Sequence, residues 1–326
     1  MSSLTSQAIL VPASERVESV KLRSVDGSTE AEFVPEANMV CSSLRHLGVE
    51  YLHQGAGVDA YARDGMTMGI PLLHPWANRL SGFRYRVAGN EVVLPRGESL
   101  IPVDDVGLPI HGAMPALMRW EVARLSPTAL TGRLHWTSGE LLRLFPFPHE
   151  LTIEARVDRG ALTIATTLAP VSEEIVPVSF GYHPYLRIPD EKRSRWRVTL
   201  GARERLLLDE AMIPTGEREP VARRRFTLAE QVLDDGFDAL DKPPQFEASA
   251  GNVALRVRFL EGYSYAQVYA PADQDFICLE PMTAPTNALV SGDGLALVAL
   301  GQQYRAAFRV SISGMPSSDP LEVVQS

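Results

Sequence analysis

Two short segments combine a strand-like run with a side chain that can transfer protons. Residues 276–287 read Phe-Ile-Cys-Leu-Glu-Pro-Met-Thr-Ala-Pro-Thr-Asn, and residues 176–185 read Val-Pro-Val-Ser-Phe-Gly-Tyr-His-Pro-Tyr. The first run delivers Glu280 and the second delivers His183. Because proline cannot donate to a β-ladder, Pro281 predicts that the first strand stops where the carboxylate emerges. A glutamate and a histidine at two strand ends indicate a general base and a general acid.

Both residues also have a non-catalytic interpretation. Most glutamates are exposed, so Glu280 could be a solvated carboxylate at a sheet edge, although an apolar Phe-Ile-Cys-Leu run before it favours the catalytic interpretation. A lone histidine in an apolar neighbourhood is more often a hydrogen-bonded core residue, and His183 taken alone fits that description. Histidine is nevertheless the natural acid at neutral pH, with an ordinary pKa of about 6.5. A nearby carboxylate is expected to raise that pKa and keep the ring protonated.

Residues 75–80 (Pro-Trp-Ala-Asn-Arg-Leu) provide groups that suit a sugar. The amide of Asn78 and the guanidinium of Arg79 match vicinal hydroxyl oxygens, and Trp76 could cover the apolar face of a sugar ring. A surface arginine beside a packing tryptophan is an equal alternative on these residues alone. The segment Ile-His111-Gly places an imidazole beside a residue that lets other groups approach closely, which is a weak signal by itself.

Period-2 alternation of apolar and polar residues recurs along the chain, whereas long segments of helical period do not. Three hairpins and three late strands are predicted: 151–157 with 162–168, 83–87 with 92–94, 120–125 with 130–136, then 253–259, 276–279 and 304–312. One short helix is expected at 227–233, where Thr227 and Glu230 have capping-box spacing. The pattern predicts an all-β fold, an antiparallel sandwich of two sheets packed face to face.

The organisation of the chain points to one sandwich domain over residues 1–314, followed by a flexible tail at 315–326. The loops 61–81 and 95–117 are long for a compact domain, and such loops are usually functional or disordered. Since they contain Arg79 and His111, a functional role is favoured.

Composition excludes several classes of function. The net charge of −9 disfavours nucleic acid and anionic membrane surfaces as partners, and no apolar run approaches the roughly 20 residues that span a bilayer. The first residues lack the pattern of a signal peptide, and Cys41 and Cys278 fit two buried thiols in a reduced cytoplasm. Motifs for metals and nucleotides are missing, so neither a metal nor another cofactor is expected. The run Arg223-Arg-Arg225 reads as a solvated basic loop without an assigned role.

Five short motifs, taken together, resemble the galactose mutarotases, which are aldose 1-epimerases. They occur in the order of that family and run through nearly the whole chain: Asn78-Arg79, His111-Gly112, His183-Pro-Tyr185, Asp234-x-x-Phe237 and Leu279-Glu280-Pro281. The resemblance implies a large antiparallel β-supersandwich with one or two short helices and an open sugar cleft.

The same resemblance implies roles for individual residues. Glu280 would be the base and His183 the acid, while the sugar hydroxyls would be held by a further set: Asn78, Arg79, His111, Tyr185 and Asp234, with Trp76 beside them. Asp238, next to Phe237, is a rival for the aspartate. The segments before Asn78 and after Glu280 depart from better-known members, so a preference for galactose is not carried over.

The function predicted is interconversion of the α and β anomers of a hexose by ring opening, in a monomer or weak homodimer whose partner is a small sugar. A bell-shaped pH profile is expected, with its acidic limb from Glu280 and its alkaline limb from His183. One alternative is a carbohydrate sensor without catalysis. Another is a glycoside hydrolase, which is disfavoured because such enzymes usually need two carboxylates.

A third alternative is an epimerase for a hexose 6-phosphate or a sulfonated sugar. Three arginines near the binding loops could meet an anion: Arg84, Arg86 and Arg96. An exposed position on strands facing solvent is the favoured interpretation of these residues.

Overall fold

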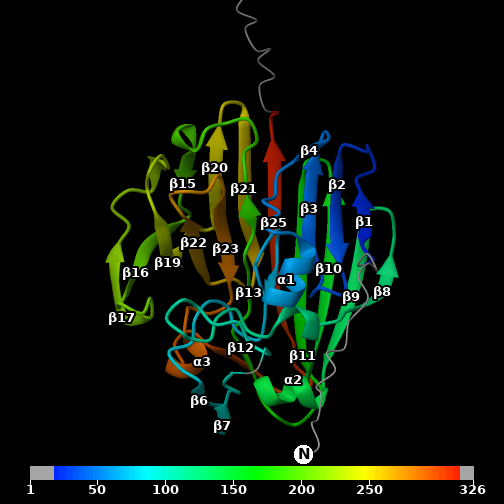
Figure 1. Cartoon of the computed structure of the whole chain (residues 1–326), viewed down its shortest axis with the longest axis vertical. Coiled ribbons are helices and arrows are strands. Elements are labelled where there is room, and N and C mark those ends of the chain that lie inside the picture. The colour runs from blue at the N-terminus through cyan, green and yellow to red at the C-terminus, as the bar shows by residue number, and fades with distance from the viewer. Residues whose placement is uncertain (1–17, 98, 316–326) are drawn as a thin grey trace, which may run out of the picture.

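The computed structural model describes residues 18–97 and 99–315. Three antiparallel sheets and two two-stranded ribbons make up most of this part of the chain, and Figure 1 shows their arrangement. All but one residue of the predicted tail at 315–326 lie outside the described residues. The all-β antiparallel fold is confirmed.

The largest sheet has nine strands and forms one layer. Its order is β18 (Arg225–Thr227), β15 (Arg197–Thr199), β20 (Gln245–Ala250), β21 (Val253–Glu261), β25 (Tyr304–Ser313), β11 (Ala161–Pro170), β10 (His149–Asp158), β9 (Ala129–Trp136) and β8 (Glu121–Leu125). The predicted hairpins β10–β11 and β8–β9 are confirmed within it.

Two smaller sheets form the second layer. One has eight strands: β17 (Pro214–Pro220), β16 (Ala202–Leu208), β19 (Leu233–Leu240), β22 (Tyr265–Ala270), β23 (Ile277–Met282), β13 (Gly181–Tyr182) and β5 (Leu72–Leu73), with β14 (Tyr185–Leu186) paired to β23. The other has four: β1 (Val20–Arg23), β2 (Thr29–Val34), β3 (Val40–His46) and β4 (Val49–Glu50). Strand β2 lies against β10, and β23 lies against β20 and β21, so both sheets cover the same face of the nine-stranded sheet (Figure 1).

Short elements complete the described part of the chain. The ribbons are β6 (Arg84–Val87) with β7 (Asn90–Val93), a predicted hairpin, and β12 (Val176–Val178) with β24 (Ala296–Val298). The helices are α1 (Val58–Asp64), α2 (Gly139–Leu144) and α3 (Ala288–Ser291), with 3₁₀ turns at Pro115–Leu117 and Arg193–Arg195. None of the helices in residues 18–97 and 99–315 is long and apolar enough to cross a membrane.

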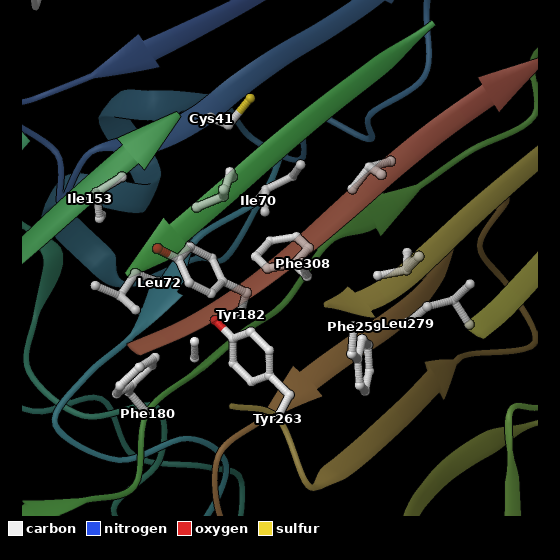
Figure 2. Close-up of a cluster of buried hydrophobic side chains, with 14 of the residues drawn as sticks. Cys41, Ile70, Leu72, Ile153, Phe180, Tyr182, Phe259, Tyr263, Leu279 and Phe308 are labelled. Carbon is white, nitrogen blue, oxygen red and sulfur yellow. The ribbon is translucent and has the colours of Figure 1, made fainter. Parts of the chain in front are cut away.

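A continuous apolar core lies between the layers. Figure 2 shows Tyr182 and Leu279 of the eight-stranded sheet beside Phe308 and Phe259 of the nine-stranded sheet, and the rings of Tyr182 and Phe308 have centroids 4.9 Å apart. Such interdigitation of inner faces is the usual way in which two sheets bury their apolar sides. Cys41 and Cys278 are buried and unpaired with each other, as the sequence predicts.

The prediction of a helix at 227–233 is wrong. Thr227 ends β18, the side chain of Leu228 is fully buried in the core, and its backbone N donates to the carbonyl of Trp196 at 2.8 Å. Leu233 then begins β19, which pairs with β16 and β22. Pairing on two edges and burial of Leu228 outweigh the local capping signal, because helix propensity is a weak prior.

The end predicted for the strand at Pro281 is also wrong. Strand β23 continues to Met282, which still pairs with Tyr265 on one side and Gly181 on the other. Neighbours on both edges keep the chain extended although one ladder donor is missing. Glu280 therefore lies within a central strand and not at its end.

The two long loops pair with each other. Arg79 and Ile110 form an antiparallel bridge, and His74 and Gly112 form a parallel one. Gly112 has φ of +80°, and a Cβ there would lie 2.1 Å from the carbonyl oxygen of His74. Only glycine allows this approach, so the loop contact depends on it.

We expect Gly112→Ala to destabilise the protein by at least about 1 kcal/mol more than Gly89→Ala. Gly89 has a similar φ of +81° but no atom near the position of a Cβ, so it reports backbone strain without the clash. Urea unfolding of both variants measures the difference. Equal losses of stability would show that the loops separate freely.

Candidate functional site

One cavity of about 180 Å³ gathers side chains from both long loops and from the outer face of the eight-stranded sheet. A cavity that holds one water has a volume of roughly 10–15 Å³, so this cavity has room for about a dozen groups of that size. A single hexose ring with its hydroxyl groups has a similar size. Ten residues line the cavity: Asn78, Arg79, Ile110, His111, His183, Tyr185, Asp234, Gln267, Tyr269 and Glu280. Seven of the eight predicted site residues, all except Trp76, are among them.

Strand alternation explains why acidic and apolar side chains separate. Leu279 points into the core between the sheets, so the next residue, Glu280, points to the opposite face of β23. Tyr182 and His183 separate in the same way at the end of β13. The side chain of Met282 packs so closely that a Cβ on Gly181 would lie 2.3 Å from its sulfur. Glycine at 181 therefore lets β13 and β23 bring the two functional side chains together.

Glu280 and His183 form the centre of the cavity. Nε2 of His183 lies 3.4 Å from Oε1 of Glu280, and their side chains are 7% and 1% exposed. The two carboxylate oxygens of Glu280 have no hydrogen-bond partner among the described residues, and Nδ1 of His183 has none either. Buried polar groups without partners are rare and costly, and they concentrate where a ligand supplies the missing bonds.

Burial reverses the protonation expected from the sequence. Desolvation raises the pKa of Glu280 well above its ordinary value, with Asp234 adding to the effect and Arg79 opposing it. Desolvation, and then the neighbouring His111, lowers the pKa of His183 well below its ordinary value. These directions are opposite to the sequence-based expectation that a neighbouring carboxylate keeps the His183 ring protonated, and burial is the largest cause of both pKa shifts.

Both pKa shifts favour a pair in which Glu280 carries the proton and the imidazole of His183 is neutral. With these directions we expect the alkaline limb of a pH profile to follow loss of the Glu280 proton and the acidic limb to follow protonation of His183, the reverse of the assignment made from the sequence. Since the groups are in contact, both limbs belong to the pair.

Arg79 is fixed between two carboxylates. Its Nε donates to Oδ2 of Asp104 at 2.8 Å, and Nη1 lies 3.6 Å from Oδ2 of Asp234. Oδ1 of Asp104 also accepts from the backbone N of Leu108 at 2.8 Å, which anchors the loop at 104–108. Although burial acts against it, these bonds hold the pKa of Asp104 below its ordinary value. Asp104 therefore orients the guanidinium from outside the cavity lining.

The imidazole of His111 stands edge-on to that of His183, with ring centroids 5.4 Å apart. Burial, followed by the charge of Arg79, lowers the pKa of His111 to about 3, so this ring is neutral at physiological pH. Tyr185 stacks on His183 with centroids 4.5 Å apart and donates or accepts a hydrogen bond with the hydroxyl of Thr67 at 2.6 Å. These contacts restrict the orientation of the His183 ring.

The sequence left two candidates for the aspartate of the site, Asp234 and Asp238. Asp234 lines the cavity, and its Oδ1 accepts from Nε2 of Gln267 at 2.7 Å. Asp238 is four residues further along β19, about 13 Å by strand geometry, and its carboxylate pairs with Arg218 at 2.7 Å. Of the two, only Asp234 lies beside Glu280 and Arg79, and burial raises its pKa.

Trp76 is the predicted site residue that lies elsewhere. Its side chain is fully buried in the main core and does not line the cavity, because its backbone bridges to Ser179 and turns the indole inward. The suggestion that it covers a sugar face is corrected accordingly. Arg84 and Arg86 pair with Glu91 on an exposed ribbon, and Arg96 lies over the ring of Phe83, so the solvent-facing interpretation of these arginines is confirmed.

Sequence reasoning missed Gln267, Tyr269, Ile110 and Asp104. The first two lie on β22, where Gln267 is opposite Glu280 and Tyr269 is opposite Cys278 in register. The alternation in Tyr-Ala-Gln-Val-Tyr over residues 265–269 is a signal that could have found them, since it places polar groups on one face. No three side chains of His, Cys, Asp or Glu in residues 18–97 and 99–315 are grouped as a metal site would require.

Comparison with known proteins identifies related chains. A family model described as aldose 1-epimerase matches residues 42–311. The uncharacterized protein YihR of Escherichia coli K12 is 24% identical over 257 residues, which are 74% of this chain and 80% of that protein.

Solved structures share the fold. The Slr1438 protein of Synechocystis sp. PCC 6803 has a TM-score of 0.76 at 22% identity and covers 94% of this chain and 100% of its own. A galactose mutarotase-like protein of Clostridium acetobutylicum has a TM-score of 0.76 at 18% identity, covering 89% and 94%. A galactose 1-epimerase of Lactobacillus acidophilus NCFM has a TM-score of 0.70 at 13% identity, covering 92% and 100%.

We expect Glu280→Gln to gain stability relative to the native protein as pH rises. Between the ordinary glutamate pKa and the raised one, the folded protein binds more protons than the unfolded chain, so its unfolding free energy falls with increasing pH. The variant does not lose this stability, because glutamine does not titrate. The loss in the native protein is about 1.4 kcal/mol for each pKa unit by which Glu280 differs between the folded and unfolded states. Urea unfolding at about pH 4 and at neutral pH measures it, with exposed Glu121→Gln as the control. A difference that does not change with pH would contradict the raised pKa.

Proposed function

Because the chain belongs to the aldose 1-epimerase family, we propose that it is an isomerase that interconverts the α and β anomers of a hexose. The observation that supports this most strongly is the contact between Glu280 and His183 inside the cavity, with 3.4 Å between Oε1 and Nε2. Mutarotation moves protons at the anomeric hydroxyl and at the ring oxygen, and both oxygens are bonded to C1. Its acid and base must therefore converge on one point, as these two side chains do.

The reaction follows from proton transfers alone. Glu280, ionised, takes the proton of the anomeric hydroxyl, while His183, protonated, gives its proton to the ring oxygen. The bond between C1 and the ring oxygen breaks, and C1 becomes an aldehyde. Rotation about C1–C2 presents the other face, and closure returns both protons. Each positioned proton-transfer group typically contributes about 10²–10⁴-fold.

The pair can hold its one proton on Glu280, which leaves both groups neutral, or on His183, which leaves both groups charged. In the free site the proton rests on Glu280, because burial disfavours the charged form of each group. A bound sugar can give hydrogen bonds to the carboxylate oxygens that lack protein partners, which favours the charged pattern. Transfer of the proton to His183 on binding then sets up the base and the acid together.

Charge in the cavity favours a neutral sugar over a phosphorylated one. Arg79 is the only lysine or arginine among the lining residues, and it is already engaged by Asp104 and Asp234. A phosphate would meet the carboxyl groups of Asp234 and Glu280 without a free cation. Hydrolysis is also disfavoured, because the two carboxylates of a glycosidase flank the bond about 5 Å or more apart, whereas the partner of Glu280 is a histidine.

We expect Glu280→Gln to lower the rate of anomer exchange by about 10²–10⁴-fold, since the base is lost while the shape of the side chain is kept. Exchange spectroscopy by NMR on glucose, galactose and glucose 6-phosphate measures the rate, with Glu121→Gln as the control. Near-native exchange in the variant would exclude Glu280 as the base. Binding of sugar without exchange in the native protein would favour the sensor alternative.

We expect Asp104→Asn to raise KM about tenfold while kcat changes little. The carboxylate holds the guanidinium of Arg79 in place, and a charged hydrogen bond is worth about 1.5–3 kcal/mol. Steady-state polarimetry separates the two constants. A loss confined to kcat would show that Asp104 acts on the proton transfers and not on the positioning of Arg79.

A further inference from the structure

A second hollow lies on the outer face of the nine-stranded sheet, around β18, β15 and β20. Its volume is about 740 Å³, and it shares no lining residue with the sugar cavity. A neighbouring hollow of about 480 Å³ shares Arg197, Thr227 and Ser249 with it, so we call the two together the arginine groove. Its polar lining includes four arginines and one carboxylate: Arg195, Arg197, Arg223, Arg225 and Glu247.

Strand register explains the polar lining. Arg197 lies opposite Thr227 on one side and Ser249 on the other, and Thr199 lies opposite Arg225 and Glu247. The alternate residues, such as Val198, point into the core. Guanidinium and hydroxyl groups of three adjacent strands are therefore presented side by side on the outer face.

Three of the four arginines that line the arginine groove have no ion-pair partner among the described residues. Arg197, Arg223 and Arg225 take part in none of the ion pairs formed by the described residues, whereas Arg224 between them pairs with Asp241. The one lining carboxylate, Glu247, is engaged by Arg256 at 2.6 Å.

Arg195 adds a fourth positive charge. Its guanidinium reaches Glu191 only at 3.9 Å, at the limit of an ion pair. A protein of net charge −9 thus concentrates unpaired positive charge in one hollow. A bound anion would neutralise this positive charge.

We propose that the arginine groove binds a small molecule that carries phosphate groups. Guanidinium is planar and presents paired donors that match phosphate oxygens, and the hydroxyls of Thr199, Thr227 and Ser249 can donate to the same oxygens. Several unpaired arginines suit a ligand with more than one negative charge. The net charge of −9 repels extended polyanions, so a small anion fits better than nucleic acid or a membrane surface.

The probes are tripolyphosphate and ATP, titrated by isothermal calorimetry into the full chain at fixed ionic strength. The test variant is Arg197→Gln/Arg225→Gln. The control is Arg124→Gln/Arg133→Gln, which removes two exposed arginines at the opposite end of the same sheet and changes the net charge equally. Neither arginine of the control belongs to an ion pair formed by the described residues. Thermal unfolding checks that both variants fold.

We expect saturable binding to the native protein, at least tenfold weaker binding to the test variant and unchanged binding to the control. Equal affinity for both probes would show that the phosphate chain alone is recognised, and tighter binding of ATP would show a contribution from the nucleoside. Absence of saturable binding, or equal weakening in both variants, would overturn the proposal. Anomer exchange is expected to continue in the test variant, so this result is independent of the proposed function.

Discussion

Burial of a carboxyl group against an imidazole is the constraint on which the rest of the site depends. Glu280 is 1% exposed and lacks a hydrogen-bond partner among the described residues, so its ionised form is costly in the free protein. The fold tolerates this because Leu279 and Ile277, its neighbours on the other face of β23, are packed into a large core. Stability supplied by the core between the sheets thus maintains a site that is unfavourable by itself.

Strands of the eight-stranded sheet supply several of the lining side chains, His183 directly follows β13, and the two long loops supply the others. Glu280, Asp234 and Gln267 come from three adjacent strands, and their spacing follows from register. Arg79 and His111 come from loops that are joined by backbone bridges and by the close approach at Gly112. The relative positions of Glu280, Asp234 and Gln267 are therefore set by the sheet, while those of Arg79 and His111 depend on the contact between the loops.

The sequence predicted the antiparallel fold and most of the cavity, because both follow from local patterns. Alternation in 151–168 identifies a hairpin without knowledge of its neighbours, and short motifs mark Glu280 and His183. The errors arose where distant contacts decide. Leu228 is buried by strands far away in sequence, Trp76 turns into the core through a bridge to Ser179, and neighbours on both edges of β23 carry it past Pro281. The direction of the pKa shifts differs from the sequence-based expectation for the same reason, since the sequence does not reveal how deeply the pair is buried.

The most direct test of the buried pair is the titration of Glu280 in protein labelled with ¹³C at glutamate carboxyl groups. NMR of the native protein and of Glu280→Gln identifies the resonance. A carboxyl that stays protonated well above the ordinary glutamate pKa of about 4.3, beside a neutral His183, is the result expected from its burial. Titration near the ordinary value would contradict the account, because the carboxylate would then be hydrated and not desolvated by its burial beside the imidazole.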